Sequence, residues 1–287
     1  MSWPYRWDLL QRYRLIEIVA YWEGRLTTNH LRNAFGIGRQ QASGDINSYI
    51  KEVGAGNLEY DRQLKGYKPT ANFKPTVTTG TADEYLHILS RTKDVAHTFE
   101  SLDLGFASTH MLELPSRPVD PVVLRALVQA AREQKRVDIG YISVNNPETD
   151  GRIIVPHTLV CTSMRWHVRA FCEKNRDYRD FVLSRFRGEP DIMEASEHGK
   201  ENDIHWHTDI ELSISPDPRL DKAQQKVIAH DYGMKRNKLT VPCKAALLHY
   251  VLQAYKLDPH KLEARPEAQQ IVIANLKTVD KWLQARA

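Results

Sequence analysis

The first seventy residues combine apolar positions at helical spacing with short glycine-containing breaks. Residues 5–22 place apolar side chains three and four positions apart, which predicts an amphipathic helix ending at Gly24. Residues 29–35 predict a short second helix with Thr28 as its N-cap, and residues 39–53 predict a third helix after a GIG turn. This order and spacing is typical of a helix-turn-helix.

In residues 57–70 the apolar side chains no longer follow helical spacing. The segment reads as a strand, a turn at Lys65–Gly66 and a second strand, which predicts a two-stranded wing directly after the third helix. We therefore expect a winged helix-turn-helix DNA-binding domain over residues 1–76.

The third helix begins with side chains suited to base recognition. A recognition helix presents polar groups at its N-terminal end to the major groove, where Arg forks onto guanine and Gln onto adenine. Hydroxyl, amide and wing side chains contact phosphates. The alternative is an ordinary three-helix cluster with a solvated polar face. The predicted DNA contacts are Thr28, Arg39, Gln40, Gln41, Ser43, Asn47, Lys65, Tyr67 and Lys68.

The next segment is a connector followed by an acidic helix. Residues 69–82 contain two prolines, a glycine and several threonines, and residues 81–97 regain helical periodicity. Its acidity disfavours DNA contact, so residues 77–117 are interpreted as a helical linker that acts as a spacer or packs on a partner element.

From Pro118 the pattern becomes one helix followed by short strands. Residues 119–135 predict a helix with Asp120 as its cap and Pro121 at its first position. Strand-like runs follow at 136–144, 151–161, 165–172 and 179–188, separated by turn residues. This order predicts a small, strongly bent β-barrel of the SH3 or Sm type over residues 118–198.

The last ninety residues predict a mixed α+β region. Strands are expected at 205–216 and 238–243, and helices at 221–233, 244–257 and 266–286. The last two helices carry more apolar side chains than a small domain readily covers, which indicates a dimerisation domain over residues 199–287; packing only within the domain is the alternative. His205 and His207 would share a strand face, but they lack a third ligand nearby, so we predict no metal site.

Composition and charge narrow the class of protein. The chain has 287 residues, 41% of them hydrophobic and 26% charged, which excludes wholesale disorder and suits two or three domains. Residues 1–76 carry 11 Lys and Arg against 7 Asp and Glu, residues 77–116 carry 2 against 6, residues 117–190 carry 13 against 9, and residues 191–287 carry 14 of each. Two basic blocks suit polyanions, and the neutral block suits a protein interface.

Other sequence features point to the cytoplasm. We expect no membrane span, since no stretch reaches about 18 apolar residues. The charged N-terminus predicts no secretion signal, and three widely spaced cysteines favour a reducing compartment.

Catalytic motifs are missing from the sequence. It contains no GxSxG, Walker loop, GxGxxG or HExxH pattern, and we expect neither an enzyme nor a cofactor. Two alternatives stay open: a non-regulatory nucleic-acid-binding subunit of a defence complex and, with less support, a metal-dependent nuclease.

One run in the middle block resembles a known family. RWHVRAFCEKNRDYRDFVLSRF, preceded by PHTLV, is similar to the signature of WYL domains, which are Sm-like barrels fused behind winged helix-turn-helix domains in bacterial regulators. The resemblance covers nearly the whole chain and extends to the branch found beside phage-defence islands, of the BrxR (BREX) and CapW (CBASS) type. The namesake triplet reads Trp166-His167-Val168 here, with Trp166 and Val168 expected in the core.

The resemblance implies a ligand-sensing site on the barrel. WYL domains are held to bind a nucleic acid or nucleotide. Alternate strand residues share a face, so hydroxyl, imidazole and guanidinium groups are expected along one rim, where Arg suits phosphate. The alternative is a solvated surface with structural salt bridges. The residues carried over are Tyr141, Ser143, His157, Arg169 and Arg185.

These features together predict an α+β multidomain regulator. We expect a homodimeric repressor of a phage-defence locus that binds a pseudo-palindromic double-stranded operator and is released by a nucleic-acid or nucleotide effector.

Overall fold

The protein is described from a computed structural model. It covers residues 4–96, 110, 112, 117–148, 150–162 and 165–284, without the side chains of residues 90–96 and 284. The chain divides into two compact units, Met1–Glu113 and Leu114–Ala287.

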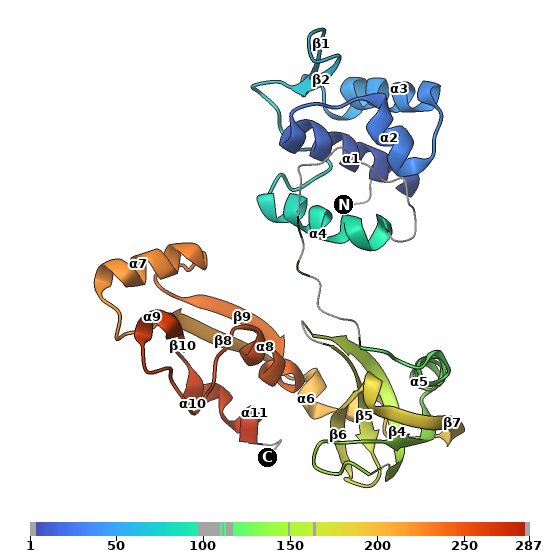
Figure 1. The fold of residues 1–287 in the computed structure, drawn as a ribbon, viewed down its shortest axis with the longest axis vertical. Coiled ribbons are helices and arrows are strands. Elements are labelled where there is room, and N and C mark those ends of the chain that lie inside the picture. Colours follow the sequence, from blue (N-terminus) through green and yellow to red (C-terminus); the bar gives the residue numbers. More distant parts are fainter. Residues whose placement is uncertain are drawn as a thin grey trace. The chain divides into compact units, whose positions relative to one another are not determined.

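The first unit opens with the expected helices. They are α1 (Trp7–Glu23), α2 (Thr28–Phe35) and α3 (Arg39–Ser48), and α3 continues into a π-helical turn over Tyr49–Val53 (Figure 1). Their apolar faces meet in one core, in which Ile16, Leu31 and Ile46 are fully buried. The winged-helix arrangement expected from the spacing is confirmed.

The N-cap of α2 is one residue earlier than expected. Thr27 has extended backbone angles, and its amide donates to His30 Nδ1 at 2.9 Å. Thr28 is therefore the first helical residue, and the prediction that Thr28 is the cap was wrong. Two adjacent threonines offer the same capping group, and the His30 contact selects between them.

The wing is an antiparallel hairpin of β1 (Leu58–Asp61) and β2 (Gly66–Pro69). The segment before α2 extends it, because the backbones of Leu26 and Tyr67 exchange two hydrogen bonds of 2.8 Å. A Cβ at Gly66 would lie 2.8 Å from the Leu26 carbonyl oxygen, so only glycine allows this approach. The wing is thus attached to the helical core.

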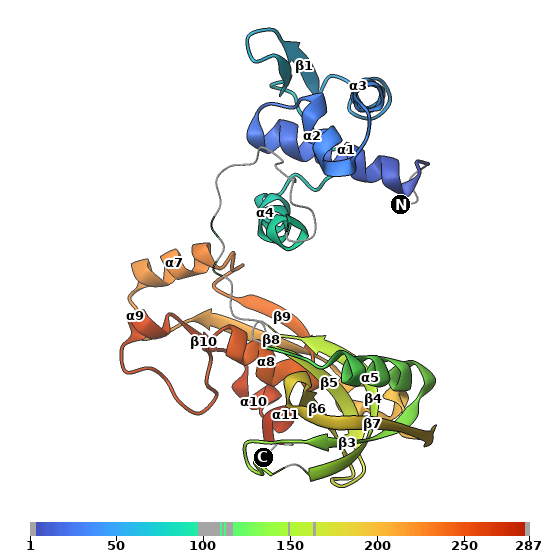
Figure 2. The same cartoon turned by 45° about the vertical axis from the view of Figure 1, so that its right-hand side comes forward.

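The connector is held down by a buried carboxylate. Glu17 on α1 is fully buried and accepts hydrogen bonds from the Tyr49 hydroxyl and from the backbone amides of residues 76–78. The acidic helix α4 (Ala82–Ala96) then packs on α1, with the rings of Trp22 and Tyr85 stacked at 5.4 Å. It lies on the side of α1 away from the wing (Figure 2). The acidic helix therefore belongs to this unit.

The second unit begins with α5 (Pro121–Glu133), whose N-cap Asp120 accepts from the Val122 amide at 2.8 Å, as expected. Five antiparallel strands follow in the order β6-β5-β4-β3-β7. Their bounds are β3 (Lys135–Tyr141), β4 (Asp150–Cys161), β5 (Trp166–Cys172), β6 (Asp177–Val182) and β7 (Phe186–Ala195). A helix followed by short strands is the order predicted for the middle domain. The run predicted as one strand over residues 179–188 instead divides into β6, a 3₁₀ turn over Leu183–Arg185 and the start of β7.

Bulges and a short turn bend this sheet. The register shifts twice along β3 against β7 and once between Pro156 and Thr158 in β4. A 3₁₀ turn over Leu183–Arg185 joins β6 to β7, which lie at the two ends of the strand order. Among the described strands, no ladder between β6 and β7 closes the barrel.

The C-terminal region starts with a 3₁₀ turn over Lys200–Asn202 and holds a second, three-stranded sheet in the order β10-β8-β9. Leu212, Leu248 and Ile271 are at most 2% exposed in its core. A 3₁₀ turn over Ala245–Leu247 precedes α8. The other elements are α6 (Ile204–His207), β8 (Asp209–Pro216), α7 (Lys222–Asp231), β9 (Leu239–Lys244), α8 (Leu248–Ala254), α9 (Pro266–Gln269), β10 (Ile271–Ile273), α10 (Leu276–Val279) and α11 (Lys281–Gln284).

The helix predicted over residues 266–286 was wrong. The segment forms three short helices and β10, which pairs antiparallel with β8 through Ile271–Pro216 and Ile273–Ile214. Three consecutive β-branched residues and an open edge of β8 outweigh the local helical spacing.

The strand predicted over residues 205–216 begins too early. His205 and His207 lie in the helical turn α6, which Asp203 caps by accepting from the Trp206 amide at 3.1 Å. They therefore do not share a strand face. In the described ranges we find no helix whose length and hydropathy would let it cross a membrane.

Candidate nucleic-acid interface

The N-terminal end of α3 presents a polar, exposed surface. Arg39, Gln40 and Gln41 are exposed, whereas Ala42 and Ile46 on the opposite face are fully buried. The buried face fixes the helix on the core, and the free backbone amides of its first turn point outward with a partial positive charge. This is the geometry that a recognition helix requires.

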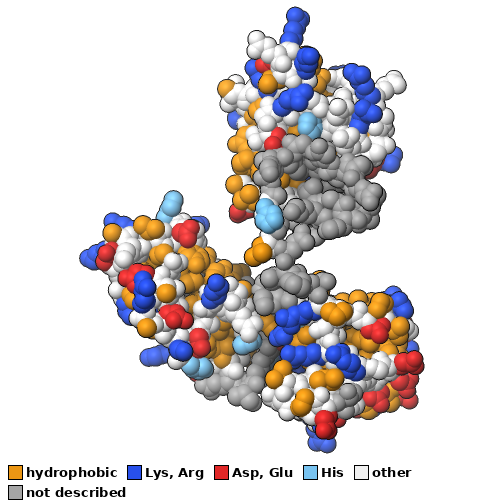
Figure 3. Space-filling model, in the orientation of Figure 1, with side chains coloured by type: hydrophobic (Ala, Val, Ile, Leu, Met, Phe, Trp, Pro, Cys, Tyr) orange, Lys and Arg blue, Asp and Glu red, His pale blue; other side chains and the backbone are white. Residues whose placement is uncertain are grey.

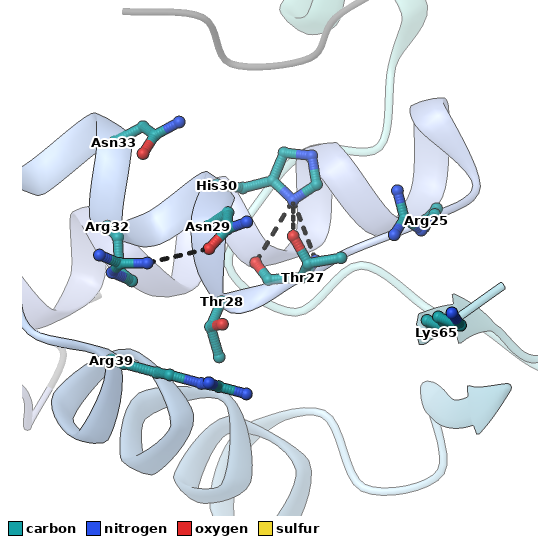
Figure 4. A pocket seen from close by; sticks show the side chains of 9 residues that line it. All are labelled: Arg25, Thr27, Thr28, Asn29, His30, Arg32, Asn33, Arg39 and Lys65. Atoms are coloured by element: carbon teal, nitrogen blue, oxygen red, sulfur yellow. Dashed lines mark hydrogen bonds between the residues drawn. The ribbon is translucent and has the colours of Figure 1, made fainter. Parts of the chain in front are cut away.

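A hollow of about 460 Å³ lies beside this end of α3 (Figure 4). None of its lining residues is acidic, and four of them are Arg or Lys. The segment before α2, α2 itself, the start of α3 and the wing all contribute. The lining residues are Arg25, Thr27, Thr28, Asn29, His30, Arg32, Asn33, Arg39 and Lys65.

Two of the four cations of the hollow have neutral partners. Arg25 Nε donates to the Leu64 carbonyl at 2.7 Å, and Arg32 Nη1 donates to Asn29 Oδ1 at 3.1 Å. These contacts orient the guanidinium groups and leave their charge uncompensated, which suits phosphate oxygens. Figure 3 shows Lys and Arg side chains on the visible face of this domain.

The predicted DNA contacts divide into three groups. Thr28, Arg39 and Lys65 line the hollow. The remaining helix residues, Gln40, Gln41, Ser43 and Asn47, lie on α3, where Ser43 alone is half-buried.

The other two wing residues are engaged inside the wing. Tyr67 packs edge-on against the ring of Tyr60 at 5.4 Å, and Lys68 Nζ makes ion pairs of 3.2 and 3.1 Å with Glu59 and Asp61. These carboxylates raise the pKa of Lys68 and compensate its charge. Lys68 is therefore less available to a phosphate than Lys65.

Apart from Thr28, sequence reasoning missed the contribution of α2 and of the segment before it. Asn29, Arg32 and Asn33 recur at helical spacing, so a polar face of α2 was readable from the sequence. The sequence gives no sign that Arg25 lines the hollow, because only the Leu26–Tyr67 bridge brings it beside the wing.

The residues expected to bind a ligand do not form one rim. Strand β5 is buried on both faces from His167 to Cys172, because its second face packs against the C-terminal region. Tyr141 lies in the core between Phe181 and Phe186, and its hydroxyl accepts from the Val182 amide at 3.1 Å. The Ser143 hydroxyl accepts from the Asn146 amide in a loop.

His157 and Arg169 do come together, but on an internal carboxylate. Arg169 is 1% exposed and binds Asp203 through Nε at 2.6 Å and Nη2 at 3.0 Å, and its Nη1 reaches Asp180 Oδ1 at 3.2 Å. His157, which lies within β4 and not at its start, contacts Asp203 at 3.2 Å. These side chains connect the middle sheet to the C-terminal region.

The electrostatics of this cluster follow from its contacts. Burial by itself raises the pKa of Asp203, but hydrogen bonds from His157 and Arg169 outweigh burial and hold the pKa well below its usual range. Burial likewise opposes the charge of Arg169, but its two carboxylate partners raise its pKa. The expected exposed anion site at Arg169 is therefore replaced by a buried ion pair.

The namesake triplet also differs from expectation. Trp166 is 51% exposed, so its expected place in the core was wrong, whereas His167 and Val168 are buried. Arg185 lies in the turn between β6 and β7. The described side chains contain no group of three or more His, Cys, Asp or Glu able to hold a metal ion.

Family models match three parts of the chain. The winged helix-turn-helix domain of BrxR transcriptional regulators matches residues 8–91, the WYL domain matches residues 122–188, and the C-terminal dimerization domain of BrxR regulators matches residues 209–279. The three matches follow the order of the observed domains.

Relatives match over nearly the full length. The DNA-binding transcriptional repressor CapW of Pseudomonas aeruginosa is 31% identical over 97% of this chain and 93% of its own, and CapW of Escherichia coli strain KTE188 is 32% identical over 94% and 90%. Among solved structures, proteasome accessory factor B/C of Arthrobacter aurescens is 16% identical with a TM-score of 0.27, and this chain spans 48% of it.

Proposed function

The chain belongs to the CapW family of DNA-binding transcriptional repressors, and from this premise we propose that it silences a phage-defence locus as a homodimer bound to an inverted repeat. A nucleic-acid or nucleotide effector at the middle domain releases it. The observation that carries the DNA-binding part is the acid-free, basic hollow beside the exposed start of α3.

In this proposal α3 enters the major groove. Arg39, Gln40 and Gln41 read base edges, while Arg25 and Lys65 hold the phosphate backbone on either side of the Leu26–Tyr67 bridge. Thr28 and Asn47 add polar contacts. Lys68 contributes less, because Glu59 and Asp61 already hold it.

Two copies of the winged domain require a symmetric operator. A dimer with twofold symmetry presents two identical recognition helices, so its half-sites form an inverted repeat one or more helical turns apart. The match of residues 209–279 to a dimerization domain supports this arrangement.

The effector part of the proposal rests on fewer residues than expected. Arg185 carries a charge that no described carboxylate pairs with, whereas Arg169 and His157 are held by Asp203. We place the effector near Arg185 and near Ser143, which lies in a neighbouring loop. Tyr141, His157 and Arg169 have structural roles in this proposal.

Selection of bound duplexes from random DNA tests the proposal. We expect enrichment of an inverted repeat whose half-sites are separated by whole helical turns. The selected duplex is then used to compare the wild-type protein with Arg39→Ala, which should lose both affinity and selectivity. Enrichment of no sequence, even at low ionic strength, would show that the chain does not act as a sequence-specific repressor.

A further inference from the structure

A glycine lies in the middle of the exposed face of α3. Gly44 follows Gln40 by four residues and precedes Asn47 by three, and residues at these spacings share one face of a helix. All three residues are exposed, whereas Ala42 and Ile46 are fully buried. In the proposed complex the exposed face enters the major groove, so Gly44 lies between two polar side chains of the face that meets the bases.

The fold itself gives no reason for a glycine at this position. The backbone of Gly44 lies outside the left-handed region, and a Cβ added to it would meet no described atom within 4 Å beyond the adjoining helix backbone. Glycine inside a helix lowers stability relative to alanine, because it loses more backbone entropy on folding. The protein therefore carries a destabilising residue where an alanine would fit.

The helix around Gly44 is anchored to the core on its other face. Asp45 Oδ2 lies 2.8 Å from Arg12 Nε on α1, and the two side chains are only 13% and 10% exposed. Ala42 and Ile46 pack in the hydrophobic core on either side of Gly44. The difference between glycine and alanine here is thus the space left on the exposed face, and in the proposed complex that space faces DNA.

The chemistry of glycine determines which base edge fits against it. The N–H and C=O groups of a residue inside a helix bond within the helix, so Gly44 offers only its Cα hydrogens. All base pairs present polar groups in the major groove, and thymine adds the one apolar group, its C5-methyl. A polar edge against Gly44 would lose water without gaining a partner, whereas a methyl group buries apolar surface.

We propose that Gly44 is a specificity-determining residue, and that the space above its Cα receives the C5-methyl group of one thymine in each half-site. The inference rests on the proposed function and deepens it by naming one base of the operator. Gln40 and Asn47, on either side, contact the polar groups of this base pair and its neighbours. An alanine at position 44 would place its own methyl group where the thymine methyl lies.

Moving a methyl group between DNA and protein tests the proposal. The probe is the operator duplex that the wild-type chain selects from random DNA. Deoxyuridine replaces each thymine in turn, at matching positions of the two half-sites, which removes only the C5-methyl groups. At one position the wild-type protein should bind the uracil duplex about fourfold more weakly for each half-site, the equivalent of one buried methyl group.

Gly44→Ala adds the methyl group to the protein. It should bind the thymine operator about tenfold more weakly than the wild type, because two methyl groups compete for one space. On the duplex with uracil at the sensitive position it should bind nearly as tightly as the wild-type protein does. Its melting temperature should rise by a few degrees, because alanine favours the helix. A glycine needed only by the fold would instead give a less stable variant.

Gly151→Ala is the matched control. Gly151 is exposed on β4 in the second unit, and among the described atoms a Cβ there would meet only Asp138 Oδ1, at 3.9 Å. The substitution adds the same methyl group outside the winged domain. Its affinity for the thymine and uracil duplexes should therefore equal that of the wild-type protein.

Three results would overturn the inference. They are half-sites without thymine, a Gly44→Ala protein that binds the thymine operator as tightly as the wild type, and a loss of affinity that no uracil substitution restores. The selection of an inverted repeat by the wild-type protein is independent of all three. A selected operator without this methyl compensation thus refutes the inference alone, and failure of the selection refutes the proposed function.

Discussion

At the scale of single residues, whether a charged side chain is already paired indicates its role better than its position in the sequence does. Lys65 and Lys68 lie three residues apart in the same wing. Lys65 lines the basic hollow, whereas Lys68 is held by two carboxylates of the facing strand. In the sequence both are wing lysines. The strand register places Lys68 opposite Glu59, whereas Lys65 lies outside the paired residues.

The two lysines give a matched pair of variants. Lys65→Ala should lower the slope of log K against log salt concentration by about 1, because one phosphate contact is lost. Lys68→Ala should change it less, since Glu59 and Asp61 already compensate the charge. Fluorescence anisotropy on the selected operator over a salt series measures both, and equal slopes for the two variants would contradict the assignment.

Gln41 provides the corresponding test of base reading. It is exposed on the first turn of α3. Gln41→Ala should cost about 1–3 kcal/mol on the selected operator and little on random duplex, because a bidentate base contact is lost while phosphate contacts stay. Competition binding measures the two losses, and similar losses on both DNAs would show that Gln41 does not read a base.

At the scale of elements, burial of β5 on both faces changes the meaning of its polar residues. Alternation along a strand identifies which residues share a face, but not what covers that face. Here the second face meets Asp203 and Tyr250 of the C-terminal region. Arg169 therefore serves the junction between the middle sheet and that region.

Removing one partner of this buried pair should be severe. Arg169→Ala leaves the Asp203 carboxylate buried without its guanidinium partner, and removing one partner of a buried ion pair typically costs about 3–5 kcal/mol. Arg185→Ala, a turn arginine without a described carboxylate partner, should leave the stability nearly unchanged. Urea unfolding followed by circular dichroism measures both. A mild effect of Arg169→Ala on stability together with lost effector binding would instead restore Arg169 to the ligand site.

The same pair predicts an acid response. The folded pKa of Asp203 lies below the unfolded value, so its contribution to stability is complete above the unfolded pKa near 3.8 and is lost as the pH falls further toward the folded pKa. Asp203→Asn should be less stable at neutral pH and should lose less stability between pH 5 and pH 3 than the wild-type protein. Parallel pH profiles from urea unfolding would contradict this assignment.

At the scale of the whole molecule, the proposed function requires two copies of the chain. The C-terminal region matches a dimerization domain, and it leaves Val227 on α7 67% exposed and Ile204 on α6 72% exposed. A symmetric operator then follows from the symmetry of the dimer.

Sedimentation at micromolar concentration measures the oligomeric state. We expect twice the chain mass of 33.1 kDa, without DNA and independent of salt, because the proposed interface is apolar. One dimer should bind one inverted repeat. A chain that sediments as a monomer and binds single half-sites would contradict the homodimer and leave the family assignment intact.

The sequence by itself determined those features that depend on neighbouring residues. The helices of the winged domain, the Asp120 cap and the succession of one helix and short strands in the middle domain follow from periodicity, capping chemistry and turn residues, which act over a few positions. The exposed polar start of α3 was predictable for the same reason.

The tertiary structure decided which groups are paired, covered or free. Arg169 and Asp203 are 34 residues apart, β10 adopts its conformation on the edge of β8, and Arg25 reaches the wing through one backbone bridge. The physical reason is that burial and charge compensation depend on contacts between distant segments. A residue's type and spacing specify its chemistry, and only the packing shows whether that chemistry is still available to a ligand.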